Sequence, residues 1–242
     1  MPIRIEECHI NGVYKITPHV FADFRGTYKK YYEERAYAQF GIQRNFTETS
    51  EIVSDKGVLR GIHYQTNDSQ SKLVHVIRGS VFDVAVDLRP NSATFGQCEE
   101  FYLTSEEEAA IFIPEHFAHG FLVLEDRTIF TYQCSGLYKP EFCGGIKWDD
   151  IDLAIRWPLT QDLKVILSEK DQKNLSLAQY RDLYCPGGGK LNEDRDCKRR
   201  ERFRGKRAGI RITSAGMEGL CPLPRRPQRE YSQKRPCGDR SI

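Results

Sequence analysis

The chain has 242 residues, 39% apolar and 29% charged, a composition typical of a soluble globular protein with one large domain, or with one ordinary domain and an extension. No apolar run approaches the roughly 18 residues of a membrane-spanning helix, and the first residues lack a signal-peptide pattern, so we expect a cytoplasmic protein. The net charge of +2 conceals an asymmetry: residues 186–242 hold 16 Lys+Arg against 7 Asp+Glu, a net of +9, which leaves −7 for residues 1–185.

Short extended segments dominate the first third of the chain. Residues 12–32 predict two strands on either side of a turn at Ala22–Asp23, and residues 34–42 predict one short helix that Gly41 can end. The strand-like stretch GVLRGIHYQ, residues 57–65, carries Arg60 and His63, which strict alternation would point to opposite faces. A β-bulge at Gly61 would turn both inward; the alternative is a surface arginine and a hydrogen-bonded core histidine.

The strand pattern continues to about residue 138. Residues 72–90 form the strongest hairpin signal, with two β-branched runs around Arg78-Gly79-Ser80, and residues 97–104, 109–125 and 127–138 predict further strands. Only residues 168–184 read as helical near the end of this part. The sequence therefore predicts an all-β fold over residues 1–185, an antiparallel sandwich or jelly-roll barrel with a few short helices.

Residues 186–242 differ from the rest. They are rich in glycine, proline and basic residues and have no sustained periodicity, so we expect a disordered or adventitious extension. Basic charge can attract nucleic acid, but no aromatic residues or motif accompany it, and we do not expect nucleic acid as a partner. None of the eight cysteines forms a CxxC pair, and we expect free thiols, with Cys134 and Cys143 near the core.

The histidines allow two kinds of chemistry. A metal site would use His63, His75, His116 and His119, but no His-x-His pair exists, and we expect none. The second possibility is acid–base chemistry, in which a histidine removes a proton beside a carbonyl, a carboxylate fixes its tautomer and a lysine holds the enolate oxygen. Each candidate residue could instead be an ordinary core or surface residue.

Several motifs resemble those of the dTDP-4-dehydrorhamnose 3,5-epimerase family. They are DFRG, GVLRGIHYQ, KLVHVIRGSVFDVAVDLRPNSATFGQ, IPEHFAHGF, YQCSGLY, IKWDDIDLAIRWP and LSEKD, in family order over roughly residues 3–180. The resemblance implies a cupin-type jelly roll without metal or cofactor, a homodimer that acts on a nucleotide-linked 4-keto-6-deoxyhexose. That reaction leads to dTDP-L-rhamnose and cell-surface polysaccharide.

The same resemblance assigns catalytic roles. His63 matches the proton-abstracting base, Tyr132 the proton donor, and Lys72 the lysine beside the reacting sugar. Asp171 matches the carboxylate partner of the histidine, with Asp83 as the alternative for that role.

Further matches imply substrate contacts. Arg25, Arg60, His119 and Lys170 match residues that bind substrate, whose diphosphate charge accounts for the arginines and the lysine. Tyr138 matches a tyrosine that stacks on the base.

Four positions depart from the family pattern. Lys30 stands where the family has a glutamate, Glu48 and Ser50 replace a Gln-x-Asn pair, and Cys143 replaces a later glutamate. We expect these to be nucleotide-side or sugar-side contacts, which leaves the reaction type intact and opens the choice of nucleotide, for example CDP. Glu48 could also pair with Lys30. The rival functions are a single-centre epimerase or ketoisomerase, a non-catalytic sugar-nucleotide or nucleic-acid binding protein, and a metal-dependent cupin oxygenase.

Overall fold

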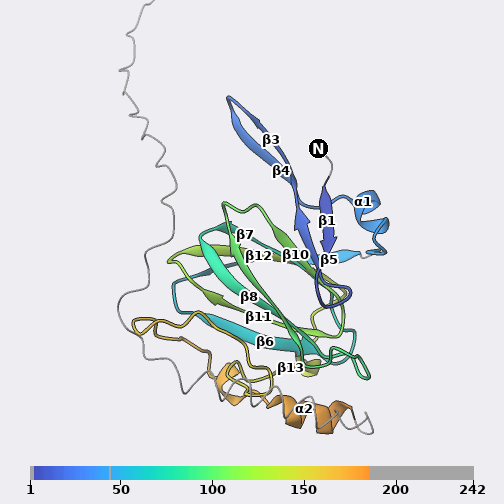
Figure 1. Cartoon of the computed structure of the whole chain (residues 1–242), viewed down its shortest axis with the longest axis vertical. Coiled ribbons are helices and arrows are strands. Elements are labelled where there is room, and N and C mark those ends of the chain that lie inside the picture. Colours follow the sequence, from blue (N-terminus) through green and yellow to red (C-terminus); the bar gives the residue numbers. More distant parts are fainter. Residues whose placement is uncertain (1–2, 44, 186–242) are drawn as a thin grey trace, which may run out of the picture. The chain divides into compact units, whose positions relative to one another are not determined.

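The computed structural model describes residues 3–43 and 45–185, which belong to one compact unit built mainly of antiparallel strands (Figure 1). The first sheet has the order β1 (Arg4–Glu7), β2 (Tyr14–Thr17), β10 (Ala110–Ile113), β7 (Lys72–Arg78), β12 (Thr128–Ser135) and β5 (Phe46–Ser54). The second has the order β13 (Cys143–Gly145), β6 (Leu59–Gln65), β11 (Phe117–Val123), β8 (Ser80–Asp87) and β9 (Cys98–Thr104). The predicted all-β jelly roll is confirmed. The expectation of disorder for residues 186–242 lies outside the described residues.

The two sheets pack face to face around one apolar interior. Val74, Val76 and Phe130 come from the six-stranded sheet, and Ala85 and Phe121 from the five-stranded sheet, and all five are at most 4% exposed. Residues that share a face with these side chains, two positions along a strand or directly opposite on a neighbour, must also point inward. This rule fixes which polar side chains reach the interior.

The predicted hairpin over residues 72–90 is wrong. Strand β7 pairs with β10 and β12, whereas β8 pairs with β11 and β9, so the chain changes sheets at Gly79. Gly79 has a φ of +81° and lies against Thr128, which leaves no room for a side chain. A hairpin and a corner between two sheets have the same sequence pattern. In this protein all eight residues of β8 are buried, because both faces of the sheet are covered at this strand.

The helices and the C-terminal segment cover parts of the outer faces of the two sheets. Helix α1 (Glu34–Ala38) covers one end of the six-stranded sheet, and helix α2 (Leu177–Tyr184), with a capping box between Ser176 and Gln179, packs with residues 146–177 against the five-stranded sheet. The predicted first helix is confirmed. The predicted helical stretch 168–184 is instead a 3₁₀ turn, η2 (Asp171–Lys173), followed by α2, and a second short turn, η1 (Pro140–Phe142), precedes β13.

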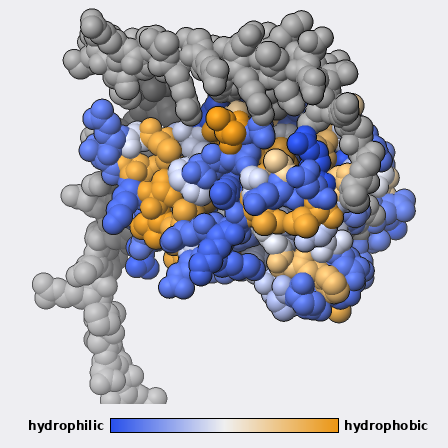
Figure 2. Space-filling view, turned by 90° about the horizontal axis from the view of Figure 1, so that it is seen from below, coloured by the Kyte–Doolittle hydropathy of each residue, from blue (hydrophilic) through white to orange (hydrophobic). Residues whose placement is uncertain are grey.

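Hydrophilic and hydrophobic areas lie side by side on the face in Figure 2.

A separate two-stranded hairpin, β3 (His19–Asp23) and β4 (Gly26–Lys30), projects away from the sandwich in Figure 1. Its turn is at Phe24–Arg25, two residues later than the sequence suggested. Phe21, Phe24 and Tyr28 are 53%, 97% and 58% exposed. In the chain by itself these aromatic side chains have little to pack against.

No helix among residues 3–43 and 45–185 is long and apolar enough to cross a membrane. The five cysteines of this part are free thiols, as predicted, with Cys134 buried and Cys143 half-buried. Cys197, Cys221 and Cys237 lie outside the described residues.

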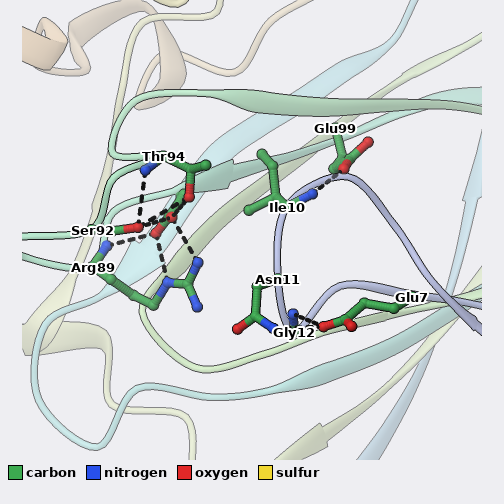
Figure 3. A network of polar contacts seen from close by, with 9 residues as sticks. Glu7, Ile10, Asn11, Gly12, Arg89, Ser92, Thr94 and Glu99 are labelled. Carbon is green, nitrogen blue, oxygen red and sulfur yellow. Dashed lines mark hydrogen bonds and ion pairs between the residues drawn. The ribbon is translucent and has the colours of Figure 1, made fainter.

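Asp87, the last residue of β8, holds the connection between β8 and β9, in which Arg89, Ser92 and Thr94 are labelled in Figure 3. Its buried carboxylate accepts hydrogen bonds from Arg89 Nε and Nη2, Ser92 Oγ and Thr94 Oγ1, at 2.9, 2.8, 2.7 and 2.5 Å. Burial alone would raise the pKa of Asp87, but the hydrogen bonds from Arg89, Ser92 and Thr94 outweigh it and lower the pKa below its usual range.

We therefore expect Asp87→Asn to lower the free energy of unfolding by about 2 kcal/mol near pH 7. Because the folded pKa of Asp87 is depressed, this contribution is complete above the ordinary aspartate pKa of about 4 and is lost as the pH falls below it. Urea unfolding at several pH values measures the difference between the two proteins, which should shrink in acid. Asp23→Asn removes the equivalent Asp–Arg fork on the exposed hairpin and should change stability little. Equal effects of the two substitutions would contradict this account.

Candidate active site

A β-bulge at Gly61 turns Arg60 and His63 toward the same interior. His63 lies opposite His119 on β11 and Arg60 lies opposite Phe121, so Gly61 and Ile62 together face only Gly120. His119 and Phe121 share a face, and therefore Arg60 and His63 do too. Gly61 has a φ of +122°, and a Cβ there would lie 2.5 Å from Gly120 Cα. The predicted bulge is confirmed.

Two histidine–carboxylate pairs lie side by side on this inner face. His63 Nε2 is 2.5 Å from Asp171 Oδ1, and His119 Nε2 is 2.8 Å from Asp83 Oδ2. Asp171 comes from turn η2, 108 residues after His63, and only 4% of it is exposed. The carboxylate beside His63 is thus Asp171, and the alternative partner Asp83 serves His119.

Burial affects the pKa values of Asp171 and His119, one residue in each pair. Burial alone would raise the pKa of Asp171, but hydrogen bonds with His63 and Ser168 outweigh it and hold the pKa below its usual range. Burial lowers the pKa of His119, while Asp83 acts in the opposite direction. Asp171 therefore stays ionised and can fix the orientation of the His63 ring. With Nε2 of His63 turned to the carboxylate, Nδ1 is the nitrogen left to accept a proton.

The six-stranded sheet supplies the opposite wall. Tyr132 lies directly opposite the core residue Val74 in the β12–β7 pairing and opposite Ser50 in the β12–β5 pairing, and Lys72 lies opposite Cys134. Burial raises the pKa of the Tyr132 phenol, and Ser50 and Arg60 partly offset this. The phenol therefore keeps its proton near neutral pH. His63 and Tyr132 thus face the interior from two different sheets.

Lys72 brings its amino group into this interior. Burial lowers its pKa, and the nearby side chains of Cys134, Asp83 and Cys143 act in the opposite direction. One oxygen of Asp83, Oδ1, is buried without a hydrogen-bond partner. An ammonium group and an unsatisfied carboxylate oxygen beside two histidines can bind a polar, oxygen-rich molecule and stabilise negative charge on it.

The residues expected at the nucleotide side lie around the loop between β12 and β13. Glu48 Oε1 accepts a hydrogen bond of 3.0 Å from the backbone N–H of Tyr138, whose ring is 57% exposed. Cys143 Sγ donates to the backbone oxygen of Lys139 at 3.2 Å. Lys170 is exposed and immediately precedes Asp171. Glu48 and Cys143 therefore hold the loop that carries Tyr138.

Arg25 and Lys30 are not brought to this cluster within one chain. Arg25 lies at the tip of the projecting hairpin, where it pairs with Asp23 at 2.6 Å, and Lys30 Nζ lies 3.1 Å from Glu33. The alternative that Lys30 pairs with Glu48 is wrong for the single chain, because each has a different partner. The roles of these residues toward a substrate stay predictions.

Sequence reasoning missed three polar residues that support the site. Gln65 bonds four groups around the Tyr138 loop, Ser54 Oγ lies 3.2 Å from Arg60 Nη2, and Asn174 bonds the backbone of the bulge. A buried glutamine on the histidine's strand was a signal for Gln65; no local pattern indicated the other two. His75, by contrast, lies on the outer face of the sheet, stacked on Tyr31, and burial lowers its pKa to about 4. Among the described residues no group of His, Cys, Asp and Glu could hold a metal ion.

Comparisons with known proteins identify one family. A sequence model of the dTDP-4-dehydrorhamnose 3,5-epimerase family matches residues 7–179. The chain is 45% identical over 169 residues to an enzyme of that name from Methanothermobacter thermautotrophicus, covering 70% of this chain and 91% of the relative.

Solved structures agree with the sequence relatives. A dTDP-6-deoxy-D-glucose-3,5-epimerase from Legionella pneumophila, in complex with dTDP-4-keto-L-rhamnose, is 39% identical with a TM-score of 0.72, over 76% of this chain and 97% of that one. A 3′-monoepimerase from Streptomyces bikiniensis, in complex with dTDP-quinovose, is 30% identical with a TM-score of 0.68, over 74% and 90%.

The electrostatics of the site can be tested directly at Lys72. Its ammonium should lose its proton at a lower pH than an ordinary lysine, because burial lowers the pKa. Asp83→Asn should lower the pKa further, since the carboxylate favours the charged form. NMR titration of labelled lysine side chains, assigned with Lys72→Arg, measures both effects. Asp23→Asn, on the projecting hairpin, should leave the Lys72 signal unchanged. An identical Lys72 pKa in wild type and in Asp83→Asn would contradict the arrangement described.

Proposed function

The chain belongs to the dTDP-4-dehydrorhamnose 3,5-epimerase family, and on that premise we propose that it converts dTDP-4-dehydro-6-deoxyglucose to dTDP-4-dehydro-L-rhamnose. It inverts C3 and C5 of the sugar and needs no cofactor. The observation that carries the proposal is the His63–Asp171 pair on one wall of the barrel interior, facing Tyr132 on the other wall. An epimerase needs a base and an acid on opposite faces of the carbon that it inverts.

The chemistry follows from the C4 ketone. C3 and C5 both flank this carbonyl, so the C–H bond at either carbon can break with its electron pair passing into an enolate. His63 Nδ1 takes the proton, and the Asp171 carboxylate stabilises the imidazolium that results. In the proposal, Lys72 and His119 hold the enolate oxygen, because both lie near Asp83 and His119 also lies near His63. Tyr132 then gives its proton to the opposite face of the same carbon, and proton exchange resets both groups.

Substrate binding divides between sugar and nucleotide. In the proposal, Arg60 and Lys170 bind the charged diphosphate, and Tyr138 stacks on the base with its exposed ring. Glu48 and Cys143 act by holding the Tyr138 loop. The hydroxyl of Ser50 supports the phenol of Tyr132. The departures at Glu48 and Cys143 thus affect the nucleotide side, whereas Ser50 acts beside the proposed proton donor.

A single-centre epimerase is the second candidate, because one structural relative is a 3′-monoepimerase. The two functions share one base and one acid and differ in which carbons exchange. A related substrate such as a CDP-linked sugar remains a prediction from Lys30, Glu48, Ser50 and Cys143. A ketoisomerase that moves the keto group is distinguished by its product, and a binding protein by the absence of any exchange.

We also propose that the protein is a homodimer in which the β3–β4 hairpin of one copy reaches the active site of the other. Phe21, Phe24 and Tyr28 are exposed on this hairpin and would be buried against a partner. Arg25, expected at the substrate, lies at its tip, outside the site of its own chain. A cytoplasmic location and a role in cell-surface polysaccharide stay predictions from the family resemblance.

The roles of base and acid can be separated by NMR in deuterated water. His63→Asn should abolish deuterium uptake at both C3 and C5, because a neutral amide cannot accept the proton at a useful rate. Tyr132→Phe should retain some uptake but lose the inverted product. Uptake by wild type at one carbon alone would favour the single-centre epimerase. Normal uptake in His63→Asn would remove His63 from the mechanism.

The shared site can be tested by subunit complementation. Arg25→Ala and His63→Asn should each be nearly inactive, whereas mixed dimers combine an intact His63 from one copy with an intact Arg25 from the other. After subunit exchange, an equal mixture should recover about a quarter of wild-type activity. As a control, a mixture of His63→Asn and Tyr132→Phe should stay inactive. Both residues lie in the site of their own chain, so each site of a mixed dimer still has one defect. No recovery in the first mixture would show that Arg25 acts within its own chain or not at all.

A further inference from the structure

The bulge that places His63 creates a local problem for the backbone. Gly61 lies in the bulge, where the regular pairing with β11 is interrupted. Gly61 is buried, and buried peptide groups need hydrogen-bond partners. A bulge without such partners could not hold the following residues in one orientation.

One turn of the chain supplies both partners. The Asp171 carboxylate accepts a hydrogen bond from the backbone of Gly61, in addition to its contact with His63. Asn174, at the end of the same 3₁₀ turn, donates from Nδ2 to the carbonyl oxygen of Gly61 at 3.3 Å and to that of Ile146 at 3.5 Å. The peptide groups of Gly61 are therefore held by side chains three residues apart.

The surroundings leave space for this amide. Asn174 is 8% exposed, and its side chain lies flat against Gly145, where a Cβ would overlap both amide atoms. Gly145 lies directly opposite His63 in the β13–β6 pairing, and its backbone conformation is one that alanine can adopt. The missing side chain at position 145 is thus explained by the amide that occupies its place.

We propose that Asn174 is a positioning residue for the proton abstraction that the proposed function assigns to His63. It fixes the bulge relative to turn η2, so that the His63 ring and the Asp171 carboxylate keep the geometry of their 2.5 Å hydrogen bond. In this role Asn174 does not contact the substrate, because its amide donates to two backbone carbonyls. Its loss acts on the base and not on the groups that bind the diphosphate.

Kinetics test this assignment. Asn174→Ala should lower kcat about 10- to 100-fold while KM changes less than about twofold, because only the alignment of the base is lost. Gly145→Ala should have the same effect by displacing the amide, and the double variant should be no worse than Asn174→Ala. Ser92→Ala, which removes a hydrogen bond from the distant Asp87 cluster, is the matched control and should leave kcat unchanged.

A double-mutant cycle separates positioning from general destabilisation. If Asn174 acts through the His63–Asp171 pair, Asn174→Ala should cause no further loss of kcat in an Asp171→Asn background. Full additivity of the two losses, or a rise in KM equal to the fall in kcat, would overturn the proposal.

A structural readout keeps the test independent of the proposed reaction. Asn174→Ala and Gly145→Ala should both speed hydrogen exchange of the Gly61 amide and shift the NMR signal of the His63 Nε2 proton, whereas Ser92→Ala should do neither. If wild type fails to epimerise the dTDP sugar, these signals still decide the role of Asn174. Unchanged signals in both variants would overturn it.

Discussion

The hydrogen bond between His63 and Asp171 is the contact on which the arrangement of the site depends. It joins strand β6 to a turn 108 residues later, so it forms only when the C-terminal segment covers the outer face of the five-stranded sheet. The carboxylate reaches the inner face past the bulge at Gly61, where the strand ladder is interrupted. The stability of the outer layer and the geometry of the base are thereby linked.

The two sheets divide the chemistry between them. The five-stranded sheet contributes His63, His119 and Asp83, turn η2 adds Asp171, and the six-stranded sheet contributes Tyr132 and Lys72. A sandwich naturally places such groups on opposite sides of whatever lies between its layers. The apolar side chains around these groups strengthen the electrostatic interactions among them, and one oxygen of Asp83 is left without a hydrogen-bond partner. This environment suits a reaction that develops negative charge on a carbonyl oxygen.

Three of the four departures from the family pattern lie away from the reacting groups, whereas the fourth, Ser50, adjoins Tyr132. Glu48 and Cys143 hold the loop of Tyr138, and Lys30 pairs with Glu33 beside the projecting hairpin. A change of nucleotide preference could therefore arise through the position of a loop or of a hairpin, without any change to His63, Tyr132 or Asp171.

The sequence by itself determined the fold class and the first helix, offered a bulge at Gly61 as one of two possibilities and proposed His63 as the base, since alternation, glycine placement and motif order are local properties. It could not show that β7 and β8 belong to different sheets, because a hairpin and a corner between sheets share one pattern of turn and β-branched residues. It also left two carboxylates as partners for His63. Only the tertiary structure assigned Asp171 to His63 and Asp83 to His119, and only it brought Asn174 to Gly61. These contacts join residues far apart in the chain, and no local propensity encodes which distant turn will pack against a given bulge.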